Sequence, residues 1–334
     1  MRALIRSFAV LALLALAALG ATAWWLYDFS QTPLRLPATP FEFMVARGAS
    51  LKTVDRQLHE AGVLPHAQSL WWLGRVTERA AGIQAGRYRL EKPVTPLELL
   101  KKLNDGDVVP VFITFVEGVT FAEMRAQLEQ DTNFKPTLKG LTDREVLKRL
   151  GVEDAHPEGW FAPDTFRFTD GATDADVLKL AYQTQRKRLM AAWDTRGEGL
   201  PYKSPYEALI MASIIEKETG KADERPLIAS VFVNRLRIPM RLQTDPTIIY
   251  GMGARFDGNI RKRDLAADTP YNTYTRDGLP PTPIAMPGAA SIQAALNPQK
   301  SDRLYFVAKG DGSHYFSATL DEHNRAVRKY QLKQ

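Results

Sequence analysis

Residues 204–220 read SPYEALIMASIIEKETG, and this stretch predicts the central helix of the protein. Ser204 is a typical N-cap, Pro205 suits the first helical position, and Glu207 is the acidic residue that such a helix start favours. Residues 208–215 are apolar around almost the whole helix circumference, which is typical of a buried helix. We therefore expect this helix at the centre of a hydrophobic core.

The end of this helix carries two carboxylates, Glu216 and Glu218. A helix C-terminus favours cations and burial disfavours charge, so both effects raise the pKa of a carboxyl there, as a general acid requires. Residues two apart point about 200° apart around the axis, so the two cannot flank one bond as the carboxylate pair of an ordinary glycosidase does. One is expected to be catalytic and the other structural, and periodicity leaves open which. The alternative is that both form the solvated end of a core helix, with Lys217 as their partner.

Composition narrows the possible chemistry. The chain has 334 residues, 45% of them hydrophobic and 25% charged, which indicates a globular protein of more than one domain. Cysteine is absent, which excludes disulfides, thiol nucleophiles and cysteine-ligated metals. The formal charge of +6 is compatible with nucleic acid, an anionic membrane surface or an acidic polymer. His314 and His323 lie in a stretch without metal-ligand spacing, so we expect no metal and no cofactor.

The N-terminal residues predict the compartment. Residues 7–27 form an uncharged run just long enough to cross a bilayer as a helix. Arginines precede the run and an aromatic cluster ends it, so we expect residues 1–6 in the cytoplasm and the remainder outside it. A cleaved signal peptide is the alternative, because Ala21 and Ala23 have cleavage-site spacing. Both alternatives export the chain, so we expect no nucleic acid as a partner.

Beyond this segment, the sequence predicts a linker and two folded regions. Residues 28–41 are proline-rich and read as a linker. Residues 42–110 predict a small α+β module with a Ser50-capped helix and a capping box at Thr95. Its strand, Gly-Ser turn and helix resemble LysM-type glycan-binding modules, although any small α+β domain can use such turns.

Residues 111–334 form the larger region, in which 111–200 predicts a helical subdomain. Helices are expected over 143–150 and 174–193, with an aromatic, proline-broken loop over 156–166 between them. A strand is expected over 304–308, followed by a Gly-Asp-Gly hairpin turn.

Several ordered motifs outside the central helix complete the pattern. They are ASVFVNRL at 229–236, MRLQTDP at 240–246, YNTY at 271–274, GLPP at 278–281, PG at 287–288, and EGW with PDT at 158–160 and 163–165. Together with ASIIEKET at 212–219, they resemble the endolytic murein transglycosylases of the MltG (YceG-like) family. The resemblance covers nearly the whole exported chain.

This resemblance implies a lytic transglycosylase that cleaves peptidoglycan without water. In lytic transglycosylases a single catalytic Glu, followed by a small hydroxyl residue, ends a core helix, and only Glu218 with Thr219 matches that pattern. Many soluble relatives have Ser where this chain has Thr219. The polar motif residues are expected to line the glycan cleft. They are Thr219, Gln243, Asp245, Tyr271, Asn272 and Tyr274.

The expected fold class is α+β, with an N-terminal transmembrane helix, a LysM-like module at 42–110 and a mixed α+β catalytic domain at 111–334 in which the buried central helix bears the catalytic Glu. The expected location is the bacterial inner membrane, with the catalytic domain outside the cytoplasm. The expected partner is the peptidoglycan glycan strand, and the family alone implies peptidoglycan synthases and endolytic action. Two rival functions stay open: a muramidase-type hydrolase that uses Asp245 as a second carboxylate, and a non-catalytic glycan-binding scaffold.

Overall fold

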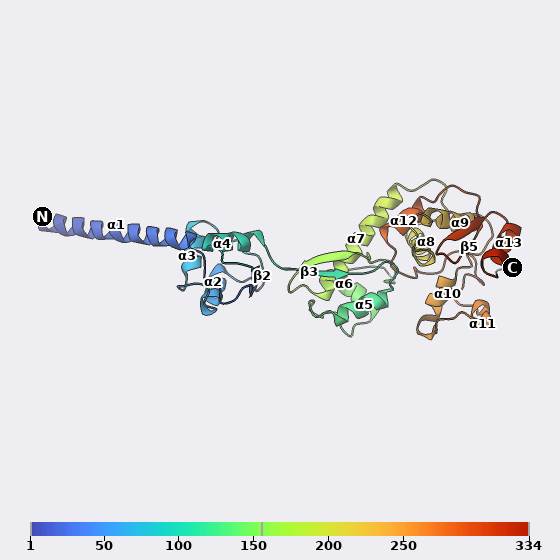
Figure 1. Cartoon of the computed structure of the whole chain (residues 1–334), viewed down its shortest axis with the longest axis horizontal. Helices are drawn as coiled ribbons and strands as arrows, with labels where there is room; N and C mark the ends of the chain where they lie inside the picture. Colours follow the sequence, from blue (N-terminus) through green and yellow to red (C-terminus); the bar gives the residue numbers. More distant parts are fainter. Residues whose placement is uncertain (1, 155, 333–334) are drawn as a thin grey trace. The chain divides into compact units, whose positions relative to one another are not determined.

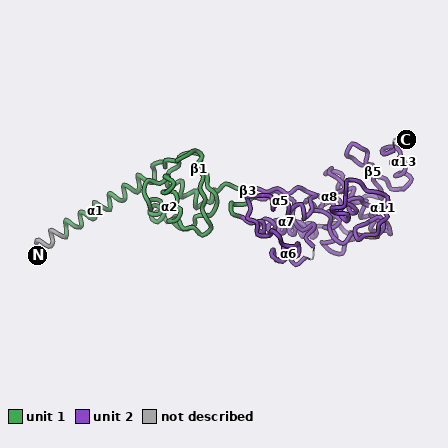
Figure 2. Tube along the Cα trace, turned by 90° about the horizontal axis from the view of Figure 1, so that it is seen from below, with its two compact units in different colours: residues 1–111, 167–171 green, residues 112–166, 172–334 purple. Residues whose placement is uncertain are grey.

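The computed structural model of the protein describes residues 2–154 and 156–332, which divide into two compact units (Figures 1 and 2). Unit 1 comprises residues 1–111 and 167–171, and unit 2 comprises residues 112–166 and 172–334. The described part of the chain is mixed α+β, because helices dominate and three two-stranded sheets accompany them. This agrees with the α+β class that the sequence predicts.

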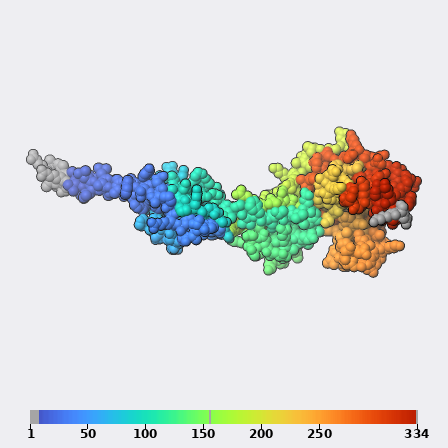
Figure 3. All heavy atoms as spheres, in the orientation of Figure 1, coloured from blue at the N-terminus to red at the C-terminus, as the bar shows by residue number. Residues whose placement is uncertain are grey.

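Helix α1 (Arg2–Gln31) begins unit 1. Among the described residues, one segment is long and apolar enough to cross a membrane, namely Phe8–Gln31 of this helix, with a mean hydropathy of 2.0. The rest of the protein buries none of its most apolar part, and Figure 3 shows most of the described helix standing clear of the other side chains of unit 1. The exposed apolar surface is compatible with a membrane anchor.

The rest of unit 1 is a small α+β module. Its elements are β1 (Phe41–Val45), α2 (Leu51–Glu60), α3 (Ser69–Val76), β2 (Gly86–Leu90) and α4 (Pro96–Asp105). Strands β1 and β2 pair antiparallel, and their inward residues pack with the apolar faces of the helices in one core. The Ser50 cap and the Thr95 capping box form as predicted.

Unit 2 contains most of the helices. It includes α5 (Phe121–Gln130), α6 (Asp143–Leu150), α7 (Asp174–Asp194), α8 (Pro205–Glu218), α9 (Arg225–Arg237), α10 (Asp245–Met252), η1 (Gly253–Arg255), α11 (Lys262–Ala266), α12 (Ala289–Leu296) and α13 (Leu320–Tyr330). Strands β3 (Pro110–Thr114) and β4 (Thr165–Thr169) form one sheet, and residues of both strands fall in each of the two units as divided above. Strands β5 (Tyr305–Ala308) and β6 (His314–Ser317) form another sheet, within unit 2. The predicted helices over 143–150 and 174–193 and the predicted hairpin after 308 are confirmed.

One element differs from the prediction. The stretch 156–166 is irregular only as far as Asp164, because β4 begins at Thr165 and continues to Thr169. The sequence TFRFT alternates polar and apolar residues with the period of a strand, and this short signal follows directly on the aromatic loop. The loop prediction was therefore wrong at its C-terminal end.

Helix α8 is the centre of unit 2. Its eight residues 208–215 are all buried, and α12, α9, α7 and α10 pack against it (Figure 1). A helix that is apolar on every side must be surrounded in this way, because any exposed face would leave apolar surface in water. The C-terminal end of α8 is thereby held in a fixed position.

Candidate active site

The start of α8 forms as its sequence predicts. The Ser204 hydroxyl oxygen accepts a hydrogen bond from the amide of Glu207 at 3.3 Å, and Pro205 occupies the first helical turn. The helix then runs without interruption to Glu218, and Thr219 is its C-cap residue. The apolar burial of the helix therefore determines which way the two terminal carboxylates point.

Glu216 points into the protein framework. Its side chain is 5% exposed, and its Oε2 accepts a hydrogen bond from the amide of Gly288 at 2.9 Å. Gly288 is the N-cap of α12, so the carboxylate satisfies a free amide at a helix start. The other oxygen of Glu216 lies 3.5 Å from the guanidinium of Arg225. Glu216 thus joins α8, α9 and α12.

Glu218 lies in a different environment. The Thr244 hydroxyl donates a hydrogen bond to its Oε1. Burial raises the pKa of Glu218, and the negative charge of Asp245 raises it further. The hydrogen bond from Thr244 and the charges of His314 and Arg235 lower it, but the net shift of the pKa is upward. The Glu218 carboxyl is therefore able to hold a proton under conditions in which an ordinary Glu is ionised.

A tight loop presents Thr244 to Glu218. The backbone of Gln243 has a φ of 50°, in the left-handed region that a residue with a side chain rarely adopts. The amide of Gln243 donates to the carbonyl of Thr273 at 3.1 Å, and the amide of Thr244 donates to the Thr273 hydroxyl at 3.1 Å. The Thr247 hydroxyl lies 3.0 Å from the same hydroxyl. This network offsets the cost of the strained backbone.

Asp245 begins α10 beside this loop. The Tyr274 hydroxyl donates a hydrogen bond to its Oδ1 at 2.7 Å. Burial raises the pKa of Tyr274, and its bond to Asp245 adds to that increase, so the phenol stays protonated and remains a donor. The structure therefore brings Glu218, Thr244, Asp245 and Tyr274 into one polar cluster within the described residues.

Residues 43–329 match the sequence model of the YceG-like family. The chain belongs to the YceG-like family. A relative named endolytic murein transglycosylase, from Bacillus subtilis strain 168, is 33% identical over 309 residues, which cover 87% of this chain and 85% of the relative.

A second relative with the same name, from Streptococcus pneumoniae strain D39, is 27% identical and covers 98% of this chain, which spans 65% of that longer protein. A crystal structure of a yceG-like protein from Listeria monocytogenes has a TM-score of 0.50 and 29% identity, covering 86% of this chain and 98% of that one.

The other predicted site residues of this YceG-like protein lie close to the cluster residues in the sequence. They are Gln243, Thr219, Tyr271 and Asn272. Gln243 is exposed next to Thr244. The Thr219 hydroxyl oxygen accepts a hydrogen bond from the amide of Lys221 at 3.0 Å, which stabilises the turn after α8. Thr219 is only 5% exposed, and its predicted contact with substrate stays a prediction.

Tyr271 and Asn272 hold their own loop in place. The Tyr271 hydroxyl lies 2.8 Å from the Thr282 hydroxyl. Asn272 is 1% exposed, and its Nδ2 donates to the carbonyls of residues 264, 265 and 267, the shortest bond being 2.7 Å. The side-chain nitrogen of Asn272 is therefore committed to the protein, and its predicted contact with substrate stays a prediction.

Sequence reasoning missed three contributors to the site. Thr244 lies within a quoted motif, but spacing does not indicate a bond to a residue 26 positions earlier. Arg235 is tied to the carbonyls of Leu242 and Leu304 at 2.6 and 2.7 Å. His314 binds Glu224 through its Nδ1 at 2.7 Å. Arg235 and His314 act electrostatically on Glu218 from the far end of α9 and from the β5–β6 hairpin, and no local pattern signals that convergence.

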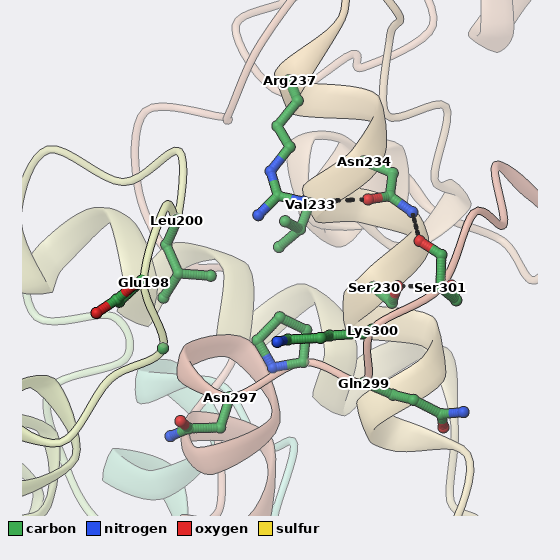
Figure 4. Close-up of a pocket in the computed structure, with 12 residues that line it drawn as sticks. Glu198, Leu200, Ser230, Val233, Asn234, Arg237, Asn297, Gln299, Lys300 and Ser301 are labelled. Atoms are coloured by element: carbon green, nitrogen blue, oxygen red, sulfur yellow. Dashed lines mark hydrogen bonds between the residues drawn. The ribbon is translucent and has the colours of Figure 1, made fainter.

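A cavity of about 300 Å³ lies elsewhere in unit 2, between α9 and the segments 197–200 and 297–301 (Figure 4). Figure 4 shows Arg237 and Asn234 projecting from α9 into it and Lys300 crossing it. None of the predicted site residues lines this cavity. This cavity therefore lies away from the carboxyl with the raised pKa.

Within residues 2–154 and 156–332, no three His, Asp or Glu side chains are arranged as metal ligands would be. The cluster instead offers one carboxyl able to carry a proton, a hydroxyl donor to it, and a second carboxylate next to it. Such a set is suited to proton transfer to and from a reacting oxygen.

Proposed function

We propose that this protein is a membrane-anchored lytic transglycosylase of peptidoglycan in which Glu218 is the catalytic acid and base. The observation that carries the proposal is the Glu218 carboxyl itself, which ends a helix whose residues 208–215 are all buried, has a raised pKa and is held by Thr244. Two relatives of the chain bear the name endolytic murein transglycosylase, which supports murein as the substrate.

In the proposed reaction, the protonated Glu218 donates its proton to the glycosidic oxygen between MurNAc and GlcNAc as the bond from that oxygen to C1 of MurNAc breaks. The resulting carboxylate then takes the proton of the MurNAc C6 hydroxyl while that oxygen bonds to C1. The product is a 1,6-anhydro end, and Glu218 has its proton back. A raised pKa serves both steps, since the group must hold a proton first and accept one later.

The neighbours of Glu218 would stabilise the charge that develops at C1. Positive charge appears there as the glycosidic bond breaks, and the Asp245 carboxylate is the nearby negative group. Tyr274 fixes the orientation of Asp245 through its hydrogen bond. We assign sugar binding to the residues around this cluster, namely Thr219, Gln243, Tyr271, Asn272 and Tyr274.

We propose that α1 anchors the protein in the bacterial inner membrane with both folded units outside the cytoplasm. The exposed apolar surface of Phe8–Gln31 supports an anchor, and the arginines before it favour this orientation. We propose that the module at 42–110 is LysM-like and holds glycan. The order strand, helix, helix, strand in β1, α2, α3 and β2 supports this assignment. Endolytic cleavage beside peptidoglycan synthases rests on the family alone.

The experiment is mass spectrometry of purified glycan strands digested by the full-length protein in detergent. We expect 1,6-anhydro ends from the wild type and none from Glu218→Gln. Reducing ends would instead identify a hydrolase, with Asp245→Asn as the variant that tests the second carboxylate. Binding without any cleavage would identify a scaffold.

Glu216→Gln is the matched control, because it alters the other carboxyl of the same helix end. Since Glu216 is bonded to Gly288 and Arg225, we expect this variant to keep the 1,6-anhydro product. Loss of cleavage in a folded Glu216→Gln together with activity in Glu218→Gln would overturn the assignment.

A further inference from the structure

A second buried carboxyl in unit 2 takes no part in the proposed reaction. Glu158 is 3% exposed. Its Oε1 accepts a hydrogen bond from the amide of Phe121 at 3.0 Å, and its Oε2 accepts one from the Tyr250 hydroxyl at 3.0 Å. Burying a carboxyl costs several kcal/mol unless it is well bonded, so a buried Glu with two such partners calls for an explanation.

The two partners belong to different parts of the unit. Phe121 is the first residue of α5, whereas Tyr250 lies on α10. The first residue of α10 is Asp245, and its N-cap is Thr244, the donor to Glu218. Glu158 therefore connects the helical subdomain to the helix that presents two members of the polar cluster.

Tyr250 also contacts the opposite side of the cluster. Its ring lies edge-on to the ring of Tyr271, with centroids 5.0 Å apart and planes at 62°. Tyr271 precedes the residues of the same loop that hold Gln243, Thr244 and Asp245. Displacement of Tyr250 would therefore disturb both segments that surround the Glu218 carboxyl.

The backbone beneath Glu158 is fixed. Gly159 has a φ of 83°, and a Cβ there would lie 2.6 Å from the Pro283 side chain. The Gln185 side chain donates to the carbonyls of Gly159 and Pro287 at 3.2 and 2.8 Å. Gln185 is itself completely buried, so these bonds are shielded from water.

We propose that Glu158 is a positioning residue for the transglycosylase reaction, which holds α10 through Tyr250 so that Thr244 and Asp245 stay aligned on Glu218. The inference rests on the proposed function, because it acts through the residues assigned there. Glu158 does not touch the reacting atoms.

The link survives protonation of Glu158. Burial raises the pKa of Glu158 to about 7, while the bonds from Tyr250 and Phe121 oppose that rise. The other titratable groups around it are Glu123 and Asp143, which raise the pKa, Tyr206, and His156, whose Nδ1 accepts from the Glu158 amide. A protonated Glu158 can donate to the Tyr250 oxygen in the same geometry, and so can the amide of a glutamine.

The test uses Tyr250→Phe, which removes one hydroxyl and keeps the ring. We expect kcat for glycan cleavage to fall roughly tenfold with KM changed less than about twofold, because misplacement near a reacting bond slows turnover more than binding. In a Thr244→Val background, Tyr250→Phe should lower kcat less than it does in the wild type. The reason is that the Thr244–Glu218 hydrogen bond, which Tyr250 is proposed to keep aligned, is already absent there. Glu158→Gln should stay within about twofold of the wild type because it preserves the link.

Tyr182→Phe is the matched control, since it removes a half-buried phenol that donates to Asp154 at 3.0 Å and does not contact α10. We expect no change in kcat for this variant. Unchanged kcat in Tyr250→Phe, or losses that multiply independently with those of Thr244→Val, would overturn the inference.

An activity-independent measurement separates this inference from the proposed function. In Tyr250→Phe, hydrogen exchange should accelerate over residues 244–252 and 269–275, with α9 as the unchanged reference segment. If Glu218→Gln remains active, the proposed function fails, but the exchange result still decides whether Glu158 holds α10. Unchanged exchange over 244–252 would contradict the positioning role.

Discussion

The Thr244 hydroxyl donates its hydrogen bond to Oε1 of Glu218, and the residue that follows it, Asp245, brings a negative charge to the same carboxyl. These neighbours act on the pKa of Glu218 in opposite directions, because the hydrogen bond stabilises the ionised form and the charge disfavours it. The pH dependence of cleavage can therefore be shifted either way by changing one of two adjacent residues.

Thr244→Val should move the alkaline limb of the activity profile to higher pH. The substitution removes a hydrogen bond that lowers the pKa of Glu218, so the acid form persists to higher pH. Turnover at neutral pH should fall roughly tenfold because the carboxylate formed in the reaction loses a charge-assisted bond. The measurement is the rate of anhydro-end formation against pH. Thr184→Val is the control, since it removes a threonine hydroxyl that bonds only within α7.

Asp245→Asn should move the same limb to lower pH. Its negative charge raises the pKa of Glu218, and the neutral amide abolishes that contribution. Asp277→Asn, which neutralises an exposed carboxylate paired with Arg241, should leave the limb in place. A limb that moves upward in Asp245→Asn would contradict the arrangement described for the cluster.

Gly159→Ala should destabilise unit 2 more than an alanine at another left-handed glycine. The left-handed backbone alone costs about 1 kcal/mol for a residue with a Cβ, and the clash with Pro283 adds about 1 to 3 kcal/mol. Gly151→Ala is the control, because Gly151 has a φ of 71° with nothing within 4 Å of its Cβ position. Thermal unfolding followed by circular dichroism should show the larger loss for Gly159→Ala.

Stability should fall as pH rises from about 4.5 to about 7, in part because of Glu158. The pKa of its carboxyl rises from 4.5 to about 7 in the folded protein. Below pH 4.5 both states hold the proton and the contribution is complete. Between pH 4.5 and 7 only the folded state keeps the proton, so the free energy of unfolding falls by about 3 kcal/mol as the pH rises. Unfolding at about pH 5 and about pH 8 should therefore differ less in Glu158→Gln than in the wild type.

The helix that carries the chemistry could be predicted because its signals are local. The Ser204 cap, the proline and the apolar run lie within one stretch, and the structure places α8 there. The divergence of Glu216 and Glu218 also follows from helix geometry alone. The strand β4 was missed because five residues of alternating pattern gave too short a signal beside an aromatic loop.

The surroundings of Glu218 could not be predicted in the same way. Thr244 bonds to it, and Arg235 and His314 act on it electrostatically, from three separate segments whose packing decides these interactions. Asn272 was predicted to bind sugar from its polar side chain, which could not show that its amide nitrogen donates to the backbone of its own loop; the contact with sugar stays a prediction. Residue type and spacing show which groups are available, and only tertiary packing determines which groups they face.

Because residues 208–215 of α8 are buried on every side, the rotation of the helix about its axis is fixed. This rotation determines where the Glu218 carboxyl points. Each residue advances a helix by about 100°, so inserting or deleting one residue upstream would rotate Glu218 away from Thr244 or force the core to repack. The side chains at 208–215 consequently determine the direction in which the carboxyl faces, although they lie far from any sugar. Volume changes in that core should appear as altered turnover before they appear as unfolding.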